Sequence, residues 1–171
     1  RLINQPNPEL WAIRSDRQVF LTAPSDRTPT GGPALTITAL VPDLHHYAGR
    51  GGRAYPLWRD AEATVPNVRP RLLTFLAENY STSVTADDVI AYIAAVVAHP
   101  AFTARFKGDL STPGLRIPLT ADAKLFADAT ELGRSVIWLH TFGERMADQD
   151  MGRPAQPPRL PPEKRPRIPK E

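Results

Sequence analysis

The sequence lacks cysteine altogether, which excludes disulfide bonds and metal sites built on thiolates. Its histidines, His45, His46, His99 and His140, include no pair at the i, i+4 spacing of a helical metal site and have no acidic partner at ligand spacing. No apolar run approaches the roughly 20 residues of a membrane helix, and no signal-peptide pattern is present. We therefore expect a cytoplasmic protein that binds no metal and contacts no membrane.

Catalytic motifs are also missing. There is no phosphate-binding Gly-x-x-x-x-Gly-Lys-Ser/Thr loop, no Gly-x-Ser-x-Gly elbow and no Gly-x-Gly-x-x-Gly turn, and residues 49–52 (GRGG) lack the lysine that a phosphate loop needs. Asn7 and Pro8 lack the second proline and the aromatic residue of an adenine-methyltransferase motif, and no nuclease motif is recognisable. These absences predict a chain without chemistry and without a cofactor of its own.

Lysine is scarce, and charge is segregated along the chain. Residues 1–71 hold nine arginines, no lysine and six acidic residues, whereas residues 72–150 hold six basic and ten acidic residues. The guanidinium group of arginine can donate two parallel hydrogen bonds to a phosphate or a guanine, so the first segment suggests a nucleic-acid contact. A general preference for arginine codons in a GC-rich genome explains the same composition without any binding role.

The first 67 residues favour β structure. Short β-prone runs cover residues 10–13 and 18–22 around a turn at 14–17, and residues 34–41 (ALTITALV) alternate as a strand does. Residues 45–53 form a basic, glycine-containing loop. Residues 54–58 (AYPLW) follow as an edge strand, because proline cannot donate to a second neighbour.

Residues 68–146 favour helices. Thr85 is a good N-cap with Asp87 and Asp88 in the first turn, and the apolar repeat that follows places Ile93 in the middle of a core-facing stripe. Pro100 ends that helix, and residues 101–110 form a second, short one. The longest helix covers residues 122–142, with an apolar face that we expect to be buried: Leu125, Ala129, Leu132, Val136 and Leu139.

Residues 147–171 contain seven prolines among many charges and predict an extended tail with no means of burying itself. Its Pro-x-x-Pro spacings could dock in an aromatic groove, or the tail could be a linker. Because the first residue is Arg1 and not methionine, we expect a piece of a longer protein. The fold class predicted is α+β: a small, twisted, antiparallel N-terminal sheet (1–67) packed on a C-terminal helical bundle (68–146) and followed by the tail.

Two clusters are candidate DNA contacts. His45, His46, Arg50 and Arg53 lie in the basic loop, where glycine allows the backbone to approach phosphates. Arg14, Arg17 and Gln18 surround the first turn, and Arg59 follows the edge strand; Arg and Gln are the side chains that pair with guanine and adenine. A solvated loop and an ordinary charged turn remain the alternatives. Trp11, Trp58 and Trp138 could stack on bases but are more simply core residues.

The order of motifs over residues 54–140 resembles the C-terminal target-recognition region of type ISP restriction-modification enzymes. The similarity lies in the apolar strand at 54–58, the helix at 67–80, the helix pair spanning 88–106, the Arg-Ile-Pro run at 116–118 and the last helix near 132–140. The resemblance implies a domain that recognises a short duplex DNA sequence and performs no chemistry itself.

The resemblance also implies partners and cofactors. The parent chain would carry an ATP-dependent translocase and nuclease and an adenine methyltransferase, using ATP, magnesium and S-adenosylmethionine. The alternative is a helical interaction module that braces the methyltransferase without touching DNA. The resemblance assigns no base-reading residues to this sequence.

Overall fold

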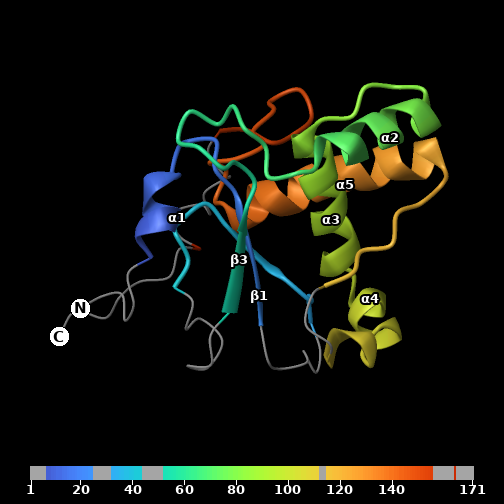
Figure 1. The fold of residues 1–171 in the computed structure, drawn as a ribbon, viewed down its shortest axis with the longest axis horizontal. Coiled ribbons are helices and arrows are strands. Elements are labelled where there is room, and N and C mark those ends of the chain that lie inside the picture. Colours follow the sequence, from blue (N-terminus) through green and yellow to red (C-terminus); the bar gives the residue numbers. More distant parts are fainter. Residues whose placement is uncertain (1–6, 25–31, 44–51, 112–114, 156–163, 165–171) are drawn as a thin grey trace.

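The chain has a mixed α+β fold in the computed structural model, which describes residues 7–24, 32–43, 52–111, 115–155 and 164. The elements follow in the order α1 (Pro8–Ala12), β1 (Phe20–Pro24), β2 (Thr36–Thr38), β3 (Gly52–Pro56), α2 (Pro70–Tyr80), α3 (Ala86–Ala98), α4 (Pro100–Arg105), the 3-10 turn η1 (Asp109–Ser111) and α5 (Ala123–His140). In Figure 1, α1 lies on one side of the sheet and α2, α3 and α5 gather on the other. The predicted α+β class, a small antiparallel sheet with helices packed against it, is confirmed.

The sheet contains β2, β1 and β3 in that order, and both pairings are antiparallel. Phe20 of β1 stands opposite Thr38 on one side and Pro56 on the other. The edge position of β3 agrees with its proline, which has no N–H to offer a further strand. β2 is shorter than the strand predicted over residues 34–41. Its end coincides with a local hydrogen bond, in which the Leu40 amide donates to the Thr38 hydroxyl at 3.0 Å and turns the chain out of the ladder.

The strand predicted over residues 10–13 is wrong, because these residues belong to α1 and the turn after it. The side-chain oxygen of Asn7 accepts a hydrogen bond from the Leu10 amide at 3.2 Å and so caps the helix. Pro8 occupies the first helical position, where its missing N–H has no partner to lose. These two end signals outweigh the weak β propensity of the short apolar run.

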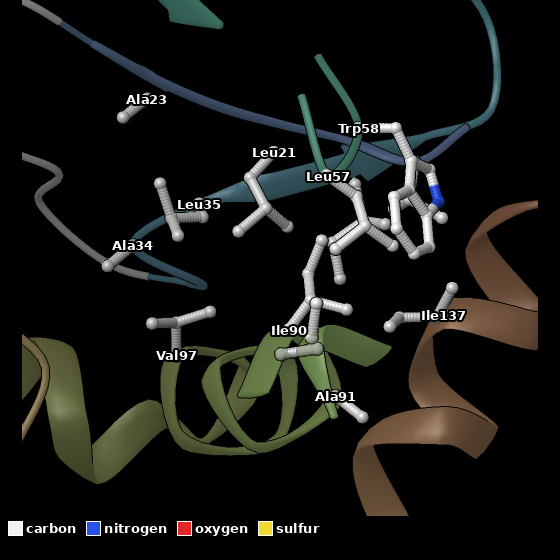
Figure 2. Packing of buried hydrophobic residues seen from close by; sticks show 14 of the residues in the cluster. Leu21, Ala23, Ala34, Leu35, Leu57, Trp58, Ile90, Ala91, Val97 and Ile137 are labelled. Atoms are coloured by element: carbon white, nitrogen blue, oxygen red, sulfur yellow. The ribbon is translucent and has the colours of Figure 1, made fainter. Parts of the chain in front are cut away.

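The main core lies between the sheet and α3. Thr85 caps α3 as predicted: its hydroxyl accepts from the Asp88 amide at 3.2 Å, and the Asp88 carboxylate accepts from the Thr85 amide at 2.7 Å. Figure 2 shows Leu21 and Leu57 reaching toward Ile90 on α3. Ile93 is only half-buried and touches the edges of both core clusters, so it is less enclosed than predicted; Ile90 takes the enclosed position.

A second core cluster lies where α2, α3 and α5 meet. The Phe126 ring stacks against Tyr92 with centroids 4.9 Å apart and against Tyr80 at 4.7 Å. The Tyr92 hydroxyl donates to the Pro118 carbonyl at 3.0 Å, and the Tyr80 hydroxyl donates to the Thr120 carbonyl. The Arg-Ile-Pro run is therefore anchored at Pro118 by the Tyr92 hydroxyl, and the segment just after it is anchored at Thr120 by the Tyr80 hydroxyl.

The face of α5 that we expected to be buried is the wrong one. Leu125, Leu132 and Leu139 are 55%, 61% and 62% exposed. The buried residues of α5 are instead Phe126, Thr130, Gly133, Ile137 and Trp138, and Gly133 among them meets α3. Gly133 decides this orientation, because a Cβ at that position would stand 1.7 Å from the Ala91 carbonyl oxygen of α3. Only glycine allows the two helices to approach this closely.

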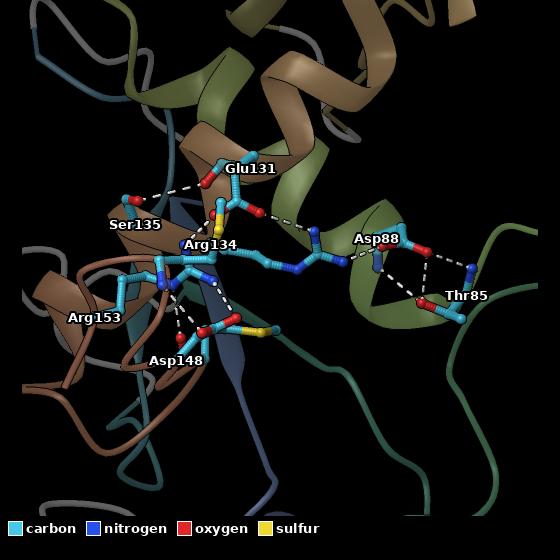
Figure 3. A network of polar contacts seen from close by, with 9 residues as sticks. Thr85, Asp88, Glu131, Arg134, Ser135, Asp148 and Arg153 are labelled. Carbon is cyan, nitrogen blue, oxygen red and sulfur yellow. Dashed lines mark hydrogen bonds and ion pairs between the residues drawn. The ribbon is translucent and has the colours of Figure 1, made fainter. Parts of the chain in front are cut away.

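The predicted extended tail begins later than residue 147. The Trp138 indole donates to the Pro154 carbonyl at 2.7 Å, and Asp148 and Arg153 form an isolated antiparallel bridge. Arg153 is 4% exposed and forms ion pairs with Glu131 and Asp148 (Figure 3). Residues 147–155 thus fold back on α5 because a buried guanidinium, which sequence composition alone does not reveal, finds carboxylates there. The rest of the predicted tail lies outside the described residues, apart from residue 164.

Candidate nucleic-acid interface

The residues predicted to contact DNA differ in their exposure in the structure, and some of them lie outside the described residues. His45, His46 and Arg50 lie outside the described residues. Four others, Arg14, Arg17, Arg53 and Arg59, are exposed, while Gln18 is completely buried. The basic loop as a unit is therefore represented only by Arg53, which is part of β3 and not of a loop.

Gln18 is a structural residue and not an exposed base reader. Its amide nitrogen donates to the Ile13 carbonyl at 2.8 Å and to the Trp58 carbonyl at 2.9 Å, and its amide oxygen accepts from the Trp58 N–H at 3.0 Å. With 0% exposure, it has no polar atom left to offer a base edge. Its hydrogen bonds join the turn after α1 to the segment that follows β3.

The side chain of Arg17 is held against Trp58, next to the hydrogen bonds of Gln18. Its guanidinium carbon lies 4.9 Å from the centre of the Trp58 ring, and its Nη1 donates to the Ala63 carbonyl at 3.3 Å. The Trp58 indole in turn donates to the Arg17 carbonyl at 3.2 Å. Trp58 is a core residue at 7% exposure, so the simpler expectation for it is correct. Arg14 has a looser support, with its guanidinium 5.4 Å from the ring centre of Trp11, which is 39% exposed.

An open hollow of about 530 Å³ lies between α1 and the free edge of β3. The polar side chains along it are both donors and acceptors: Arg53, Arg59, Asn7, Glu9, Asn67 and the hydroxyl of Tyr55. Arg53 of the predicted basic loop and Arg59, which follows the predicted edge strand, thus line the same hollow. Glu9, Asn7 and Asn67 are not among the contacts that the sequence predicts. Glu9 lies in α1 and Asn7 caps it, and most of this helix was predicted as a strand.

The loop behind Arg59 is rigidly built. The Asp60 carboxylate accepts from the amides of Thr64 and Val65 and from the Thr64 hydroxyl, and the Arg59 amide donates to the Val65 carbonyl at 2.8 Å. The Thr64 hydroxyl, followed by the Val65 amide, lowers the pKa of Asp60 below its usual 3.8. The carboxylate is consequently ionised at neutral pH and keeps the loop closed. Asn67 is fixed similarly, since its Nδ2 donates to the Pro56 carbonyl at 3.0 Å.

The electrostatics of this side differ from those of the helices. Ion pairs among the described residues involve Lys124, Arg134, Arg145 and Arg153, all in the C-terminal half. In the described part of the chain, the exposed arginines at 14, 17, 53 and 59 have no carboxylate at ion-pair distance. Arg17 does act electrostatically on the carboxyl group of Asp87. Burial raises the pKa of Asp87, and the positive charge of Arg17 partly lowers it again. Unpaired guanidinium groups remain available for an anionic ligand.

Among the residues that the structure describes, none of the helices has the length and hydrophobicity of a membrane-spanning segment. Within the same ranges, no three histidine or acidic side chains come together in a way that could hold a metal ion.

Comparison with known proteins gives one family and one fold. The profile of the family described as "Type ISP C-terminal specificity domain" matches residues 1–170. No curated protein matches the chain. Among solved structures, the cryoEM structure of a DrdV–DNA complex is similar, with a TM-score of 0.60 and 21% identity over 75% of this chain. The likeness concerns the fold alone, and it covers 12% of the DrdV chain.

Proposed function

Since the chain belongs to the family of type ISP C-terminal specificity domains, we propose that it recognises a short duplex DNA sequence on behalf of a larger restriction-modification enzyme. The family match covers residues 1–170 and so extends the resemblance carried by residues 54–140 to the arginine-rich segment. A fold shared with a chain from a DNA complex supports the same proposal.

The observation that carries the proposal is the group of four exposed arginines without carboxylate partners in the described residues, two of which line the hollow between α1 and β3. Phosphate binding requires cations alone, whereas reading base edges requires acceptors as well as donors. The hollow offers both, because Glu9 can accept from a cytosine amine and Arg53 and Arg59 can donate to guanine. Arg14 and Arg17, outside the hollow and supported by tryptophan rings, suit phosphates.

The wider role follows from the family and remains part of the proposal. The chain would act inside a longer cytoplasmic polypeptide, called here the parent polypeptide, that combines an ATP-dependent translocase and nuclease with an adenine methyltransferase. ATP, magnesium and S-adenosylmethionine would bind to those other parts. We expect the 171-residue chain alone neither to transfer labelled methyl groups to DNA nor to hydrolyse ATP, and detection of either reaction would contradict this.

A salt titration of DNA binding tests the proposal. The 171-residue chain should bind fluorescent duplexes of random sequence with an affinity that falls steeply as salt increases. Replacing Arg53 or Arg59 with alanine should lower the salt slope by about one if the side chain touches phosphate. If it reads a guanine, the loss should be about 1–3 kcal/mol at a single base position.

Arg105→Ala is the matched control for that titration, because Arg105 is an exposed arginine at the end of α4, away from α1 in Figure 1. It should leave the affinity unchanged. Absence of salt-dependent binding, or equal binding by all three variants and the unmodified chain, would favour the alternative of a module that braces the methyltransferase without DNA contact.

A further inference from the structure

Glu9 is the only acidic side chain among the described residues that line the hollow between α1 and β3. It is exposed, and within the described ranges no cation lies at ion-pair distance from its carboxylate. The other charged groups along the hollow are the guanidinium groups of Arg53 and Arg59. The hollow therefore presents charges of both signs to a ligand, and in the described part of the chain these charges are not paired with one another.

The fold fixes the positions from which these charges are presented. Glu9 belongs to the first turn of α1, and the next residue, Leu10, is buried at 8% exposure and so sets the rotation of that helix. Arg53 belongs to β3, and the backbone of Arg59 is held by the hydrogen bond from its amide to the Val65 carbonyl at 2.8 Å. The carboxylate and the guanidinium groups thus come from separate elements of one frame.

A carboxylate on a surface that binds DNA has an electrostatic cost, because it repels the phosphates that attract the arginines. A hydrogen bond from a base offsets this cost. In the major groove, cytosine and adenine are the bases that offer an amine. Adenine also carries the acceptor nitrogen N7 beside its amine, which repels a carboxylate, whereas cytosine has no such acceptor. The chemistry of Glu9 therefore favours cytosine.

We propose that the hollow reads one C·G base pair in the major groove, with Glu9 as the specificity-determining residue for the cytosine and Arg53 or Arg59 on the guanine of the same pair. Guanine presents two acceptors there, O6 and N7, so a carboxylate on the neighbouring cytosine amine needs a cation beside it. The hollow supplies this combination, because both kinds of charge line it. This inference rests on the proposed function, since it names the base pair that the same site recognises.

A change of base preference tests the inference. Selection from a random duplex library with the unmodified 171-residue chain gives the preferred sequence, and competition binding then measures every base-pair change in it. With Glu9→Gln, the preference at one C·G position should move toward adenine by at least about fivefold, the low end for a base contact, because glutamine both donates to and accepts from adenine. Glu9→Ala should lose the cytosine preference there without gaining adenine. Both variants should bind random duplexes more tightly than the unmodified chain, since a repulsive charge is gone.

Glu78→Gln is the matched control, because Glu78 is an exposed glutamate of α2 that does not line the hollow. It should leave the preference at every base position unchanged. The thermal midpoints of both Glu9 variants should stay within a few degrees of that of the unmodified chain, because Glu9 is exposed. A purely structural role of Glu9 in α1 would weaken binding to all sequences alike and would create no preference for adenine, and that result would overturn the inference.

Failure of this inference and failure of the proposed function give different results. Arg53→Ala or Arg59→Ala should relax the same base pair that Glu9→Gln alters. If the unmodified chain binds a preferred sequence but both Glu9 variants keep every preference, the inference is wrong and DNA recognition stands. Relaxation by the arginine variants at a different base pair alone, or a preferred sequence without a C·G pair, would also overturn it. Absence of salt-dependent binding by the unmodified chain would instead refute the proposed function, and this inference with it.

Discussion

The arginines near α1 and β3 and those packed against α5 behave in opposite ways. Near α1 and β3 they are exposed and have no carboxylate partner in the described part of the chain, whereas Arg134, Arg145 and Arg153 near α5 are 27%, 11% and 4% exposed in their side chains and are paired. Composition alone does not separate the two groups. What separates them is the position of the acidic residues, because Asp88, Glu131, Glu144 and Asp148 lie next to Arg134, Arg145 and Arg153 and make these three guanidinium groups internal cross-links.

The largest expected effect tests the cross-linking role. Arg153→Ala removes a buried guanidinium that pairs with Glu131 and Asp148 and whose Nε donates to the Met146 carbonyl at 2.8 Å. We expect the free energy of unfolding to fall by about 2–4 kcal/mol, somewhat less than for a fully enclosed pair because the two carboxylates keep access to water. Urea denaturation followed by circular dichroism measures this. A loss below about 0.5 kcal/mol, the usual surface value, would place Arg153 with the exposed group.

The next effect concerns Gln18, which the sequence places among the DNA contacts and the structure places in the interior. Gln18→Ala leaves the Ile13 and Trp58 carbonyls and the Trp58 amide without their partner. We expect a loss of about 2–3 kcal/mol in stability, from unsatisfied buried groups. The base preference of whatever folded protein remains should not change, as selection from a random duplex library would show. An altered base preference in a Gln18→Ala variant of normal stability would instead show that Gln18 contacts DNA.

Arg53 and Arg59 should give the reverse result. Alanine at either position should change the free energy of unfolding by less than about 0.5 kcal/mol, because both side chains are exposed. DNA affinity should fall by about 1–3 kcal/mol if a base contact is lost. Thermal unfolding and anisotropy measured on the same samples make the comparison with Arg153→Ala direct. A variant that loses stability and affinity in parallel would erase the distinction between the two groups.

The smallest expected effect concerns the carboxyl group of Asp87, which lies in the helical half and is influenced by the exposed Arg17. Burial raises the pKa of Asp87 above 3.8, against the lowering influence of Arg17. A carboxyl with a raised folded pKa stabilises the fold below its unfolded pKa, and this contribution is lost as pH rises through the folded pKa. Asp87→Asn should therefore remove a small decrease in the thermal midpoint between acidic and neutral pH. Arg17→Ala should enlarge that decrease, and an unchanged pH profile in both variants would contradict the coupling.

The sequence predicts best where one residue determines local geometry. Thr85 with Asp88 fixed the start of α3, and Pro100 marked the break before α4, because capping and a missing N–H act within one turn. The regular spacing of leucines in α5 was also visible in the sequence. Such spacing predicts that the leucines share one face of the helix, but it does not predict whether that face is buried or exposed. That depended on contact between Gly133 and Ala91, which lie 42 positions apart and have no signature in either segment.

The candidate site was predictable only in part for the same reason. Arginine-rich composition pointed to Arg53 and Arg59, yet the hollow that they line is also lined by α1, whose apolar residues resembled a strand. Gln18 was misassigned because its chemistry suits a base edge and a backbone carbonyl equally well. Burial decides between the two, and burial at Gln18 is set by the distant Trp58.

The bonds of Arg145 have a consequence for how the protein is made. Its Nε donates to the Gln18 carbonyl at 2.9 Å and its Nη2 to the Ser15 carbonyl at 3.1 Å, contacts that span 127 and 130 positions. During synthesis, the turn carrying Arg14 and Arg17 is made long before Arg145, whose side chain anchors it. This turn therefore reaches its final shape only after Arg145 has been made, and a nascent chain stopped before Arg145 would present Arg14 and Arg17 without this support.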